Sequence, residues 1–326
     1  MGRAAPVALV GATASGKSTL ALGLARLRPE LEIVSVDSMC VYRGMDIGTA
    51  KATASEQRAV RHHLLDVVEP GDEFTVHDFQ RQARAALADI EARGRRALFV
   101  GGTGLYLRAV VDDLELPGRF ASVASALESE ATAPDGVALL YARLVALDPV
   151  AATRTEPTNA RRIVRALEVT IGSGRKFSSF GPGLAAYPST PFVLVGLPFD
   201  AGRDDARIEA RLAAHLDAGL LEEVRALRDH PGGMARTARQ ALGYRELLSH
   251  LEDGVPLEDA VAETARRTKA FARRQWAWFR RDPRITWLDT SGDLLDQLLS
   301  VWDGAGSIPP ASADSQRSEV PLQVGD

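Results

Sequence analysis

Short apolar runs alternate with segments of helical spacing in the N-terminal third of the chain and again in its last third. Near-continuous apolar runs are typical of parallel strands buried on both faces, and they occupy residues 7–10, 31–37, 95–100 and 191–197, with shorter candidates at 62–67 and 285–288. Apolar residues with helical spacing occupy residues 19–25, 77–93, 204–229, 236–251, 257–281 and 294–302. This alternation predicts an α/β fold with a mostly parallel sheet flanked by helices.

The strand–helix alternation stops at about residues 114–118. From there to residue 187 the pattern is helical only, with candidate helices at residues 123–130, 136–147 and 158–171. We therefore predict a helical insertion domain, residues 119–187, within a catalytic core made of residues 1–118 and 188–303. Residues 304–326 are rich in Ser, Pro and Ala, lack apolar periodicity and are expected to be disordered.

Composition indicates a soluble, cytoplasmic protein. The 326 residues are 45% hydrophobic and 25% charged, as in an ordinary globular protein. No apolar run approaches the ~20 residues that span a membrane, and the N-terminus runs directly into a strand, so we expect no signal peptide. The single cysteine, Cys40, excludes intrachain disulfides. A net charge of −4 argues against a broadly basic nucleic-acid binder, although an average can hide local basic patches.

A Gly-rich turn follows the first predicted strand and leads into a helix. It consists of Gly11, Ala12, Thr13, Ala14, Ser15, Gly16, Lys17 and Ser18. Strand, Gly-rich turn, Lys-Ser and helix, in this order, form a P-loop, which cradles a di- or triphosphate with backbone amides and the positive end of the helix. Lys17 would add a full positive charge, and the Ser18 hydroxyl is a ligand for Mg²⁺. The loop alone indicates a nucleotide, ATP or GTP, and leaves open what is done to the phosphate.

Asp37 ends the second predicted strand, at the edge of the sheet where parallel strands place ligands. We expect this strand to lie beside the strand that precedes the P-loop, so that the carboxylate reaches the space in front of the phosphates. There Asp37 could act as a base or hold Mg²⁺ through water. The alternative is a turn or cap residue, because Asp37-Ser38 is also favourable turn chemistry.

The third long strand ends without an acidic residue. Many NTP hydrolases place an Asp there to position Mg²⁺, whereas this chain continues from Val100 into Gly101-Gly102-Thr103-Gly104. The absence favours a small-molecule kinase or a group transferase over a motor or a switch. Thr103 could direct its hydroxyl and amide at a phosphate, or it could belong to an ordinary tight turn.

Charged residues supply further candidates. Arg207, Arg211 and Arg225 are predicted on one long helix; solvated ion pairs are the default there, but an arginine facing the site would clamp a diphosphate. Residues 154–176 carry six basic and two acidic side chains, and residues 266–284 carry eight and one, interleaved with Phe and Trp. An amphipathic helix explains one such segment, but two favour a polyanion such as RNA. Three histidines lack metal-ligand spacing and are interpreted as structural: His62, His63 and His77.

Nine motifs follow one another along most of the chain. They occupy residues 11–18, 35–38, 42–51, 63–66, 100–106, 161–168, 241–246, 272–275 and 278–280. In this order they resemble the motifs of the bacterial tRNA dimethylallyltransferases, also called tRNA isopentenyltransferases. The run Gly-Met-Asp-Ile-Gly-Thr-Ala-Lys at residues 44–51 is far more specific than the P-loop alone.

The resemblance implies a P-loop NTPase-like core and an insertion domain that binds the anticodon loop. It implies transfer of a dimethylallyl group from dimethylallyl diphosphate to N6 of the adenine immediately 3′ of the tRNA anticodon, with Mg²⁺ as cofactor. Asp37 then matches the general base, and Thr103 and Arg211 match residues near the diphosphate, with Arg211 stabilising the departing pyrophosphate. Lys17 and Ser18, with the loop amides, would hold the diphosphate and the metal. The implied tRNA-contacting residues are Asp37, Ser38, Met39, Cys40, Thr103, Arg161, Arg162, Ile163, Val164, Arg165, Arg239, Gln240, Gly243, Tyr244 and Arg245.

The chain departs from the family pattern at residues 120–127, where the family often has arginines and this sequence reads Phe-Ala-Ser-Val-Ala-Ser-Ala-Leu. No zinc-finger-like Cys/His tail, as in the longer eukaryotic version, is present in the sequence. We expect a monomer whose partners are the tRNA anticodon stem-loop and dimethylallyl diphosphate, with no membrane. Three alternatives stay open: a small-molecule P-loop kinase, an isopentenyltransferase acting on free adenine nucleotides, and a non-enzymatic nucleotide-dependent RNA binder.

Overall fold

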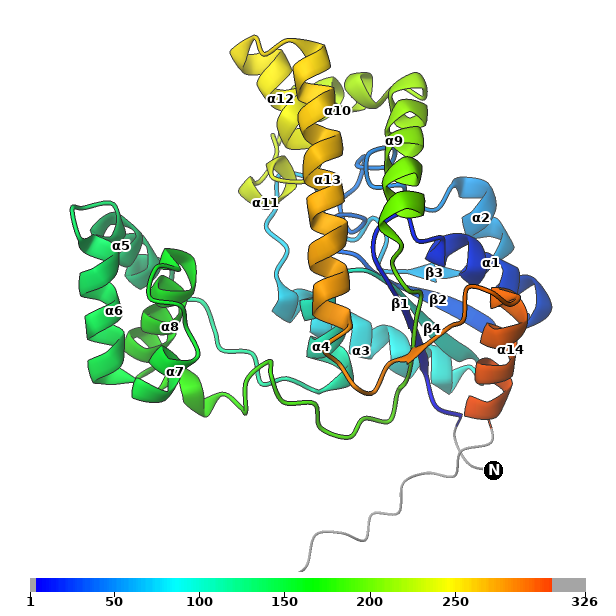
Figure 1. The fold of residues 1–326 in the computed structure, drawn as a ribbon, viewed down its shortest axis with the longest axis horizontal. Coiled ribbons are helices and arrows are strands. Elements are labelled where there is room, and N and C mark those ends of the chain that lie inside the picture. The colour runs from blue at the N-terminus through cyan, green and yellow to red at the C-terminus, as the bar shows by residue number, and fades with distance from the viewer. Residues whose placement is uncertain (1–3, 307–326) are drawn as a thin grey trace, which may run out of the picture. The chain divides into compact units, whose positions relative to one another are not determined.

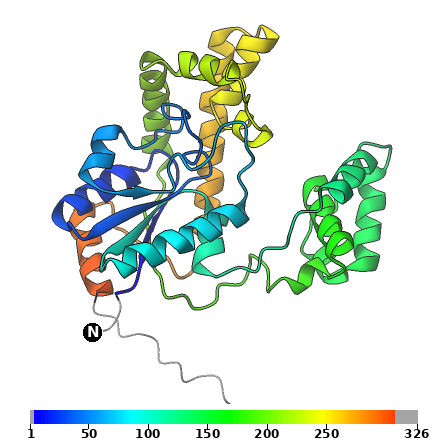
Figure 2. The same ribbon diagram turned by 180° about the vertical axis from the view of Figure 1, so that it is seen from behind.

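The computed structural model describes residues 4–306 and divides the chain into two compact units (Figures 1 and 2). One unit holds the residues up to Val111 and from Ser189 onward, and the other holds Asp112–Pro188. The helical unit thus begins at residue 112, a little before the position 119 expected from the sequence pattern. The first boundary directly follows the last residue of a helix, and the second falls in a segment that is neither helix nor strand.

A six-stranded parallel sheet forms the centre of the first unit. In chain order the strands are β1 (Val7–Val10), β2 (Leu31–Val36), β3 (His62–His63), β4 (Arg96–Gly101), β5 (Val193–Gly196) and β6 (Thr286–Trp287). In space the order is β3-β2-β4-β1-β5-β6. The side chains of β1 and β2 are buried along their whole length. Burial on both faces explains why these strands have apolar residues at nearly every position rather than at every second one.

β4 lies between β1 and β2 in the sheet. β1 pairs with β4 and β5, whereas β2 pairs with β4 and β3. The expectation that the Asp37 strand lies directly beside the P-loop strand is therefore wrong, because the chain runs outward from β2 to β3 and then returns to fill the intervening place with β4. Asp37 still lies at the same edge of the sheet as the P-loop, since the carboxyl ends of parallel strands share one edge.

Helices cover both faces of this sheet (Figure 1). α1 and α14 bury Leu24 and Trp302 against one face, and α3 and α4 bury Phe79 and Leu107 against the other. Their bounds are α1 (Lys17–Leu27), α3 (Val76–Ala92), α4 (Gly104–Val111) and α14 (Leu294–Ala305). The first two residues of the segment predicted to be disordered, 304 and 305, therefore belong to α14. Residues 307–326 of that segment lie outside the described residues.

Five helices between β5 and β6 extend from the sheet (Figure 1), with α9 and α13 side by side. They are α9 (Ala201–Asp217), α10 (Leu220–Arg228), α11 (Arg236–Arg239), α12 (Tyr244–Asp253) and α13 (Leu257–Phe279). The sequence pattern merged α9 with α10 and α11 with α12. The chain breaks at Gly219 and Gly243, whose φ angles of +97° and +86° are not helical and favour glycine.

The second unit is a bundle of short helices. They are α5 (Ala121–Ala131), α6 (Gly136–Leu147), α7 (Pro149–Thr153), α8 (Ala160–Ser173) and the 3₁₀ turn η1 (Phe177–Ser179). Leu127, Leu144 and Leu167 lie in its own apolar core, so the unit packs around residues from its own helices. α8 was expected at residues 158–171, and it begins at residue 160 because Asn159 caps it by accepting from the Arg162 amide.

Three helices were absent from the sequence prediction: the eight-residue α4 and two that are shorter. The two shorter helices are α2 (Ala54–Ala59) and α7, with six and five residues, too few to show a helical period. Each begins with a side-chain cap, from Thr53 and Asp148 respectively. Within residues 4–306, no helix has the length and apolar character needed to cross a membrane.

A buried carboxylate ties β2 to the edge of the sheet. Glu32 is 5% exposed and accepts hydrogen bonds from Arg93 and from His63 of β3. These charge-assisted bonds, the Arg93 bond above all, lower the pKa of Glu32 to about 2. The carboxylate is therefore ionised throughout the ordinary pH range and stabilises the fold in that form.

We expect Glu32→Gln to lower the free energy of unfolding at pH 7 by about 2–3 kcal/mol, because hydrogen bonds to a charged group are lost. The Glu32 contribution is complete above its unfolded pKa of about 4.3 and fades as the pH falls toward 2. Urea titrations should therefore show a smaller difference between variant and wild type at pH 3.5 than at pH 7. Glu69→Gln, which removes an exposed pair with Arg43, is the control; an equal loss in both variants would contradict the prediction.

Candidate active site

The P-loop joins β1 to α1 and leaves the start of that helix open to an anion. Ala14 and Gly16 have φ angles of +63° and +95°, which turn the chain tightly enough to direct successive amides into the loop. The first turn of α1 contains no acidic residue, and Gly16 offers no side-chain cap. The positive end of α1 is therefore available for a negatively charged group.

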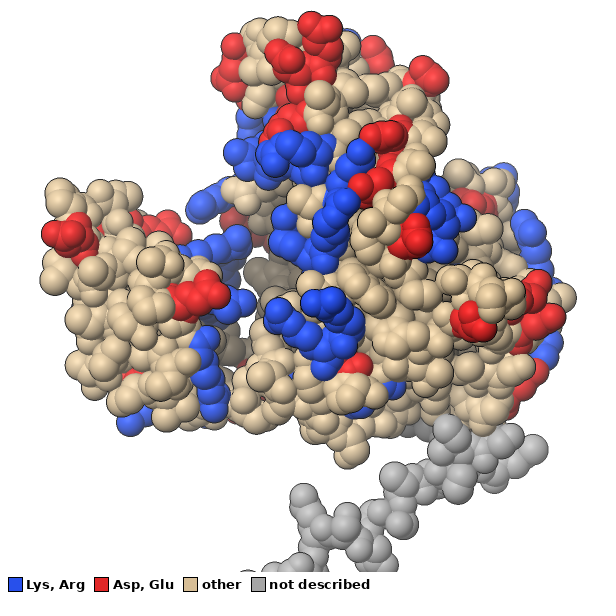
Figure 3. Space-filling model, in the orientation of Figure 1, with Lys and Arg blue, Asp and Glu red and all other residues tan. Residues whose placement is uncertain are grey.

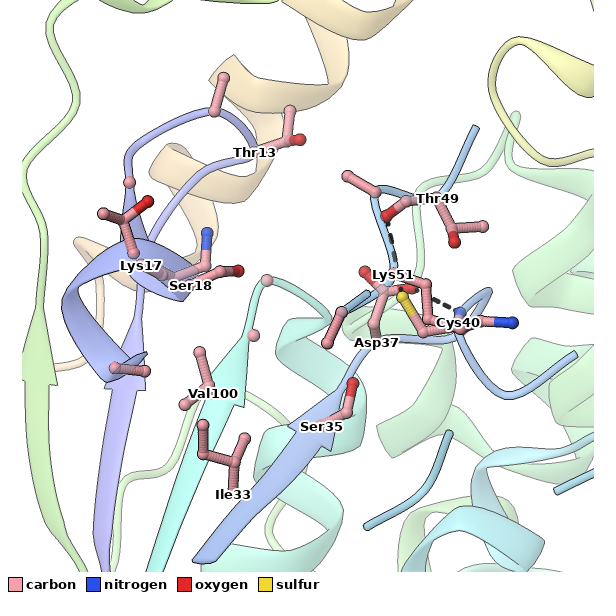
Figure 4. Close-up of a pocket in the computed structure, with 18 of the residues that line it drawn as sticks. Thr13, Lys17, Ser18, Ile33, Ser35, Asp37, Cys40, Thr49, Lys51 and Val100 are labelled. Carbon is pink, nitrogen blue, oxygen red and sulfur yellow. Dashed lines mark hydrogen bonds between the residues drawn. The ribbon is translucent and has the colours of Figure 1, made fainter. Parts of the chain in front are cut away.

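The Lys17 side chain folds back and bonds to the loop itself. Its Nζ atom donates to the Ala12 carbonyl at 2.6 Å and to the Ser15 hydroxyl at 3.3 Å. Burial, and next the nearby charge of Arg211, lower the pKa of Lys17 to about 8. Lys17 and Ser18, the next residue, line one pocket of the first unit (Figure 4). A bound anion would stabilise the charged form of Lys17, which the surrounding protein disfavours.

Two distant helices attach to the P-loop through Thr13. The Arg211 Nη2 atom, on α9, donates to the Thr13 hydroxyl at 2.7 Å. Gln275, on α13, accepts from the Thr13 amide at 2.8 Å and donates to the Gly102 carbonyl at 2.9 Å. Burial lowers the pKa of Arg211, which remains a cation because arginine starts from a very high value. A guanidinium from α9 and a side-chain amide from α13 thus both hold the loop at Thr13.

Asp37 follows β2 and has one carboxylate oxygen in a turn. Its Oδ1 atom accepts from the amides of Met39 at 2.7 Å and Cys40 at 3.2 Å, while the Thr103 hydroxyl accepts from the Ser38 amide at 3.2 Å. Both amide bonds go to Oδ1, and Oδ2 of Asp37 accepts none from the backbone amides of residues 4–306. The turn and the functional interpretations are therefore compatible, because the turn holds one oxygen and leaves the other free to accept a proton.

Two pockets in the first unit share a wall. The first, of about 390 Å³, is lined by Lys17, Ser18 and Arg207 among others. The second, of about 300 Å³, is lined by polar groups that include Thr103. Figure 4 shows Lys17 and Ser18 on one side of the first pocket, and Asp37 with Thr49 across from them. Five residues line both pockets: Thr13, Asp37, Thr49, Arg211 and Phe271.

Glycines at the end of β4 allow other elements to approach this wall. A Cβ atom on Gly101 would lie 2.0 Å from the Val36 carbonyl oxygen, and one on Gly102 would lie 2.3 Å from the Gln275 side chain. One on Gly104 would lie 2.2 Å from the Trp278 ring. The Gly-Gly-Thr-Gly run therefore lets β2 and α13 pack against the end of β4, and Thr103 is the one residue of the run with a side chain.

Some of the first-unit residues that were expected to contact tRNA line the two pockets, and others do not. Ser38, Met39, Thr103, Gln240, Gly243 and Tyr244 line the second pocket, and Cys40 lines the first. Tyr244 is fully buried, so its side chain is not an exposed contact. Arg239 pairs with Glu252, and neither it nor Arg245 is among the residues that line the two pockets.

The residues of α8 that were predicted to contact tRNA differ in their exposure to solvent. The side chains of Arg161 and Arg162 are exposed, whereas Ile163 and Val164 are buried in the core of the second unit. The helical period turns Ile163 and Val164 inward, so their side chains are not exposed for such a contact. Arg165 pairs with Glu168 and donates to the Pro117 carbonyl.

The basic segment 266–284 is largely neutralised by neighbouring acids. Figure 3 shows Lys and Arg side chains gathered along α13, with acidic side chains next to them. Five of its eight basic residues form ion pairs: Arg266 with Glu263, Arg267 with Glu246, Lys269 with Glu209, Arg273 with Asp205 and Arg284 with Asp282. The interpretation of this segment as a free basic patch is therefore wrong for most of its residues. Arg225, also expected on the helix of Arg211, lies on α10.

All three histidines, His62, His63 and His77, were predicted to be structural, and the hydrogen bonds of two of them agree with this role. His63 bonds Glu32 and His62 bonds the Val60 carbonyl. No group of three or more His, Cys, Asp or Glu residues that could hold a metal ion occurs in the described part of the chain. A metal in the first pocket would therefore take most of its ligands from a bound phosphate and water, an arrangement that suits Mg²⁺.

Sequence reasoning missed the roles of Gln275, Thr49 and Phe271. Gln275 belongs to a motif singled out above, but its partners Thr13 and Gly102 are 262 and 173 positions away. Only the fold brings them together. Phe271 gives an aromatic surface to both pockets, and the helical pattern of α13 assigned such residues to the core.

The fold and the site define a P-loop α/β protein with two pockets that share a wall. The family model of the IPP transferases matches residues 40–282. A tRNA dimethylallyltransferase from a Nocardioides strain is 49% identical over 90% of this chain and 94% of its own length. One from Bifidobacterium animalis subsp. lactis is 43% identical over 98% and 93%. The chain belongs to the IPP transferase family.

Solved structures agree with this assignment. A tRNA isopentenylpyrophosphate transferase from Bacillus halodurans matches with a TM-score of 0.65 at 36% identity, over 92% of this chain and 95% of that one. A eukaryotic dimethylallyltransferase acting on tRNA matches with a TM-score of 0.72 at 28% identity, over 93% and 76%. The predicted α/β fold, with its mostly parallel sheet and P-loop NTPase-like core, and the predicted prenyltransferase family are confirmed.

The pKa of Lys17 leads to a prediction for anion binding. Lys17 is mostly protonated at pH 7 and mostly neutral at pH 9 in the empty site, so wild-type affinity for magnesium pyrophosphate should lose the lysine contribution over this range. We expect the affinity ratio of wild type to Lys17→Met to fall by about tenfold between pH 7 and pH 9. Calorimetric titrations of both proteins measure this ratio, in which the titration of pyrophosphate itself cancels. Parallel pH curves for the two proteins would contradict the prediction.

Proposed function

We propose that this protein transfers a dimethylallyl group from dimethylallyl diphosphate to N6 of the adenine immediately 3′ of the anticodon in tRNA, and releases pyrophosphate. The observation that carries the proposal is the shared wall: Asp37 and Arg211 line both the P-loop pocket and the second pocket. A diphosphate on one side and a base on the other would place the reacting atoms between these two side chains. The names of the relatives support this choice of donor and acceptor.

The diphosphate would occupy the P-loop pocket. The amides at the start of α1, the Lys17 ammonium and the Arg211 guanidinium would bind its oxygens. The Ser18 hydroxyl would hold Mg²⁺ together with those oxygens. When bound, Mg²⁺ supplies positive charge that stabilises the leaving pyrophosphate. Arg211, placed by Thr13, would stabilise the same charge as it develops.

The adenine would occupy the second pocket, beside the free oxygen of Asp37. Its N6 atom would attack C1 of the dimethylallyl group, the C1–O bond would break, and the N6 proton would pass to Oδ2 of Asp37. The turn that holds Oδ1 orients the carboxylate for this step. Thr103 would fix the turn through the Ser38 amide. The reaction requires that the base leave its stack in the anticodon loop and enter the pocket.

The helical insertion would contact the anticodon stem-loop through the exposed face of α8. Arg161 and Arg162 are exposed there, and phosphate contacts from arginine give affinity without reading the sequence. We infer that the protein works as a monomer in the cytoplasm, where its tRNA substrates are. A kinase, an enzyme acting on free nucleotides and a non-enzymatic RNA binder are distinguished from this proposal by the outcome of the first experiment below.

Purified protein should attach labelled dimethylallyl to unmodified tRNA that carries an adenine at this position, and tRNA with another base there should stay unlabelled. Asp37→Asn keeps the size of the side chain and removes the base, so we expect a fall in kcat of about 10²–10⁴-fold. Asp253→Asn, an exposed change at the end of α12, is the matched control.

Three results of this assay would contradict the proposal. Labelling of AMP but not of tRNA would indicate an enzyme that acts on free nucleotides. ATP consumed on a small alcohol, with tRNA unlabelled, would indicate a kinase. RNA binding that survives Asp37→Asn, with no product from any protein, would indicate a binding protein.

The arginines of α8 give a second test. Arg161→Ala together with Arg162→Ala should raise KM for tRNA severalfold and leave KM for the diphosphate unchanged. Each lost phosphate contact should reduce the salt slope of tRNA binding by about one. Arg175→Ala, whose side chain pairs with Glu115 and stacks on Phe180, is the control within the same unit. An unchanged salt slope in the double variant would contradict the assignment.

A further inference from the structure

One carboxylate holds the loop that follows Asp37. The Oε2 atom of Glu223, on α10, accepts from the amides of Asp46 at 2.9 Å and Ile47 at 2.8 Å, and Oε1 accepts from the amide of Gly48 at 3.2 Å. The Tyr244 hydroxyl, on α12, also donates to Oε1, at 2.5 Å. Four hydrogen bonds therefore converge on Glu223, and three of them come from consecutive residues of one loop.

The Tyr244 ring packs closely against the same loop. A Cβ atom on Gly48 would lie 2.5 Å from the ring, so glycine is needed for this contact. Tyr244 is fully buried. Burial, and next the charge of Glu223, raise the pKa of Tyr244 far above its ordinary value, so the hydroxyl keeps its proton and donates. The carboxylate and the phenol thus form one charge-assisted unit under the loop.

The held loop leads directly to the wall between the pockets. Thr49 follows Gly48 and lines both pockets. The Cys40 thiol donates to the Thr49 carbonyl at 3.8 Å, and the Cys40 amide donates to Oδ1 of Asp37. A continuous series of hydrogen bonds and single residues therefore connects Glu223 to the carboxylate at the shared wall.

We propose that Glu223 and Tyr244 are positioning residues for the transfer reaction: they fix the loop of residues 46–49 and, through Thr49 and Cys40, the orientation of Asp37 between the two pockets. This inference rests on the function proposed above. Neither residue contacts the first pocket through its charged or polar group, and Glu223 lines neither pocket. Their effect should therefore appear in the rate of the reacting complex and not in the binding of the diphosphate.

The chemistry of the carboxylate suggests a graded set of variants. Glu223→Gln keeps the size but replaces one acceptor oxygen by an amide that donates, which then faces a backbone donor. Tyr244→Phe keeps the ring against Gly48 and removes one hydrogen bond. Glu222→Gln is the matched control, because Glu222 is the exposed neighbour of Glu223 on the same helix, with only a 3.7 Å pair to Arg225.

The measurements are kcat and KM for tRNA labelling, affinity for magnesium pyrophosphate, thermal unfolding, and hydrogen exchange of the amides of residues 46–48. We expect kcat to fall about 10–100-fold in Glu223→Gln and less in Tyr244→Phe, by misplacement of the base. KM for the diphosphate and pyrophosphate affinity should change by less than about threefold, and exchange at residues 46–48 should accelerate. The double variant should be no slower than Glu223→Gln, because both residues act through one unit.

Two results would overturn the inference. One is a kcat for Glu223→Gln equal to that of Glu222→Gln. The other is a loss of pyrophosphate affinity and folding that matches the loss of kcat, since a merely structural role predicts all three together. A wild-type protein that labels no tRNA would instead overturn the proposed function. In that case, unprotected amides at residues 46–48 in the wild type would separately overturn the anchoring by Glu223.

Discussion

A concentration of positive charge at the start of α1 organises the core of this protein. The open helix end, the Lys17 ammonium and the Arg211 guanidinium all lie around one loop, and no acidic side chain occupies the first turn of the helix. Burial, and next the repulsion from Arg211, lower the pKa of Lys17 to about 8. Such an arrangement is costly in an empty site and favourable around a polyanion. The braces from α9 and α13 hold the charges in place despite this repulsion.

The glycines of the site follow from the same constraint. To reach the P-loop, Gln275 must pass over the end of β4, where any side chain at Gly102 would meet it. To set Asp37 near the loop although β4 intervenes, β2 must press against Gly101. The contact of Gly101 with the Val36 backbone cannot be adjusted by a rotamer change, and this contributes to a rigid wall. A rigid wall is what a reaction between two separately bound substrates requires.

The sequence predicted the elements better than their arrangement. The four long strands and the helical insertion can be recognised locally, because burial on both faces and helical spacing each determine which consecutive residues are apolar. The position of β4 between β1 and β2 has no such local signature, since it depends on where the chain crosses. The breaks at Gly219 and Gly243 were missed because apolar spacing continues across them. In the site, the P-loop, Asp37 and Arg211 were predicted, whereas Gln275 and Glu223 were not, because their partners are far away in sequence.

The same distinction applies to charge. Counting basic residues in segment 266–284 suggested a surface for RNA, but the partners of Lys269 and Arg273 are acids of α9, and that of Arg267 is an acid of α12. Much of the basic charge of α13 therefore holds the helices above the sheet together. The chain has a net charge of −4, and arginines of α13 are engaged in ion pairs. The protein therefore has little long-range attraction for RNA. Under the proposed function, recognition must then depend on local contacts: a base held in the second pocket and a few exposed arginines such as Arg161. Such contacts favour the shape of an opened loop over a regular duplex.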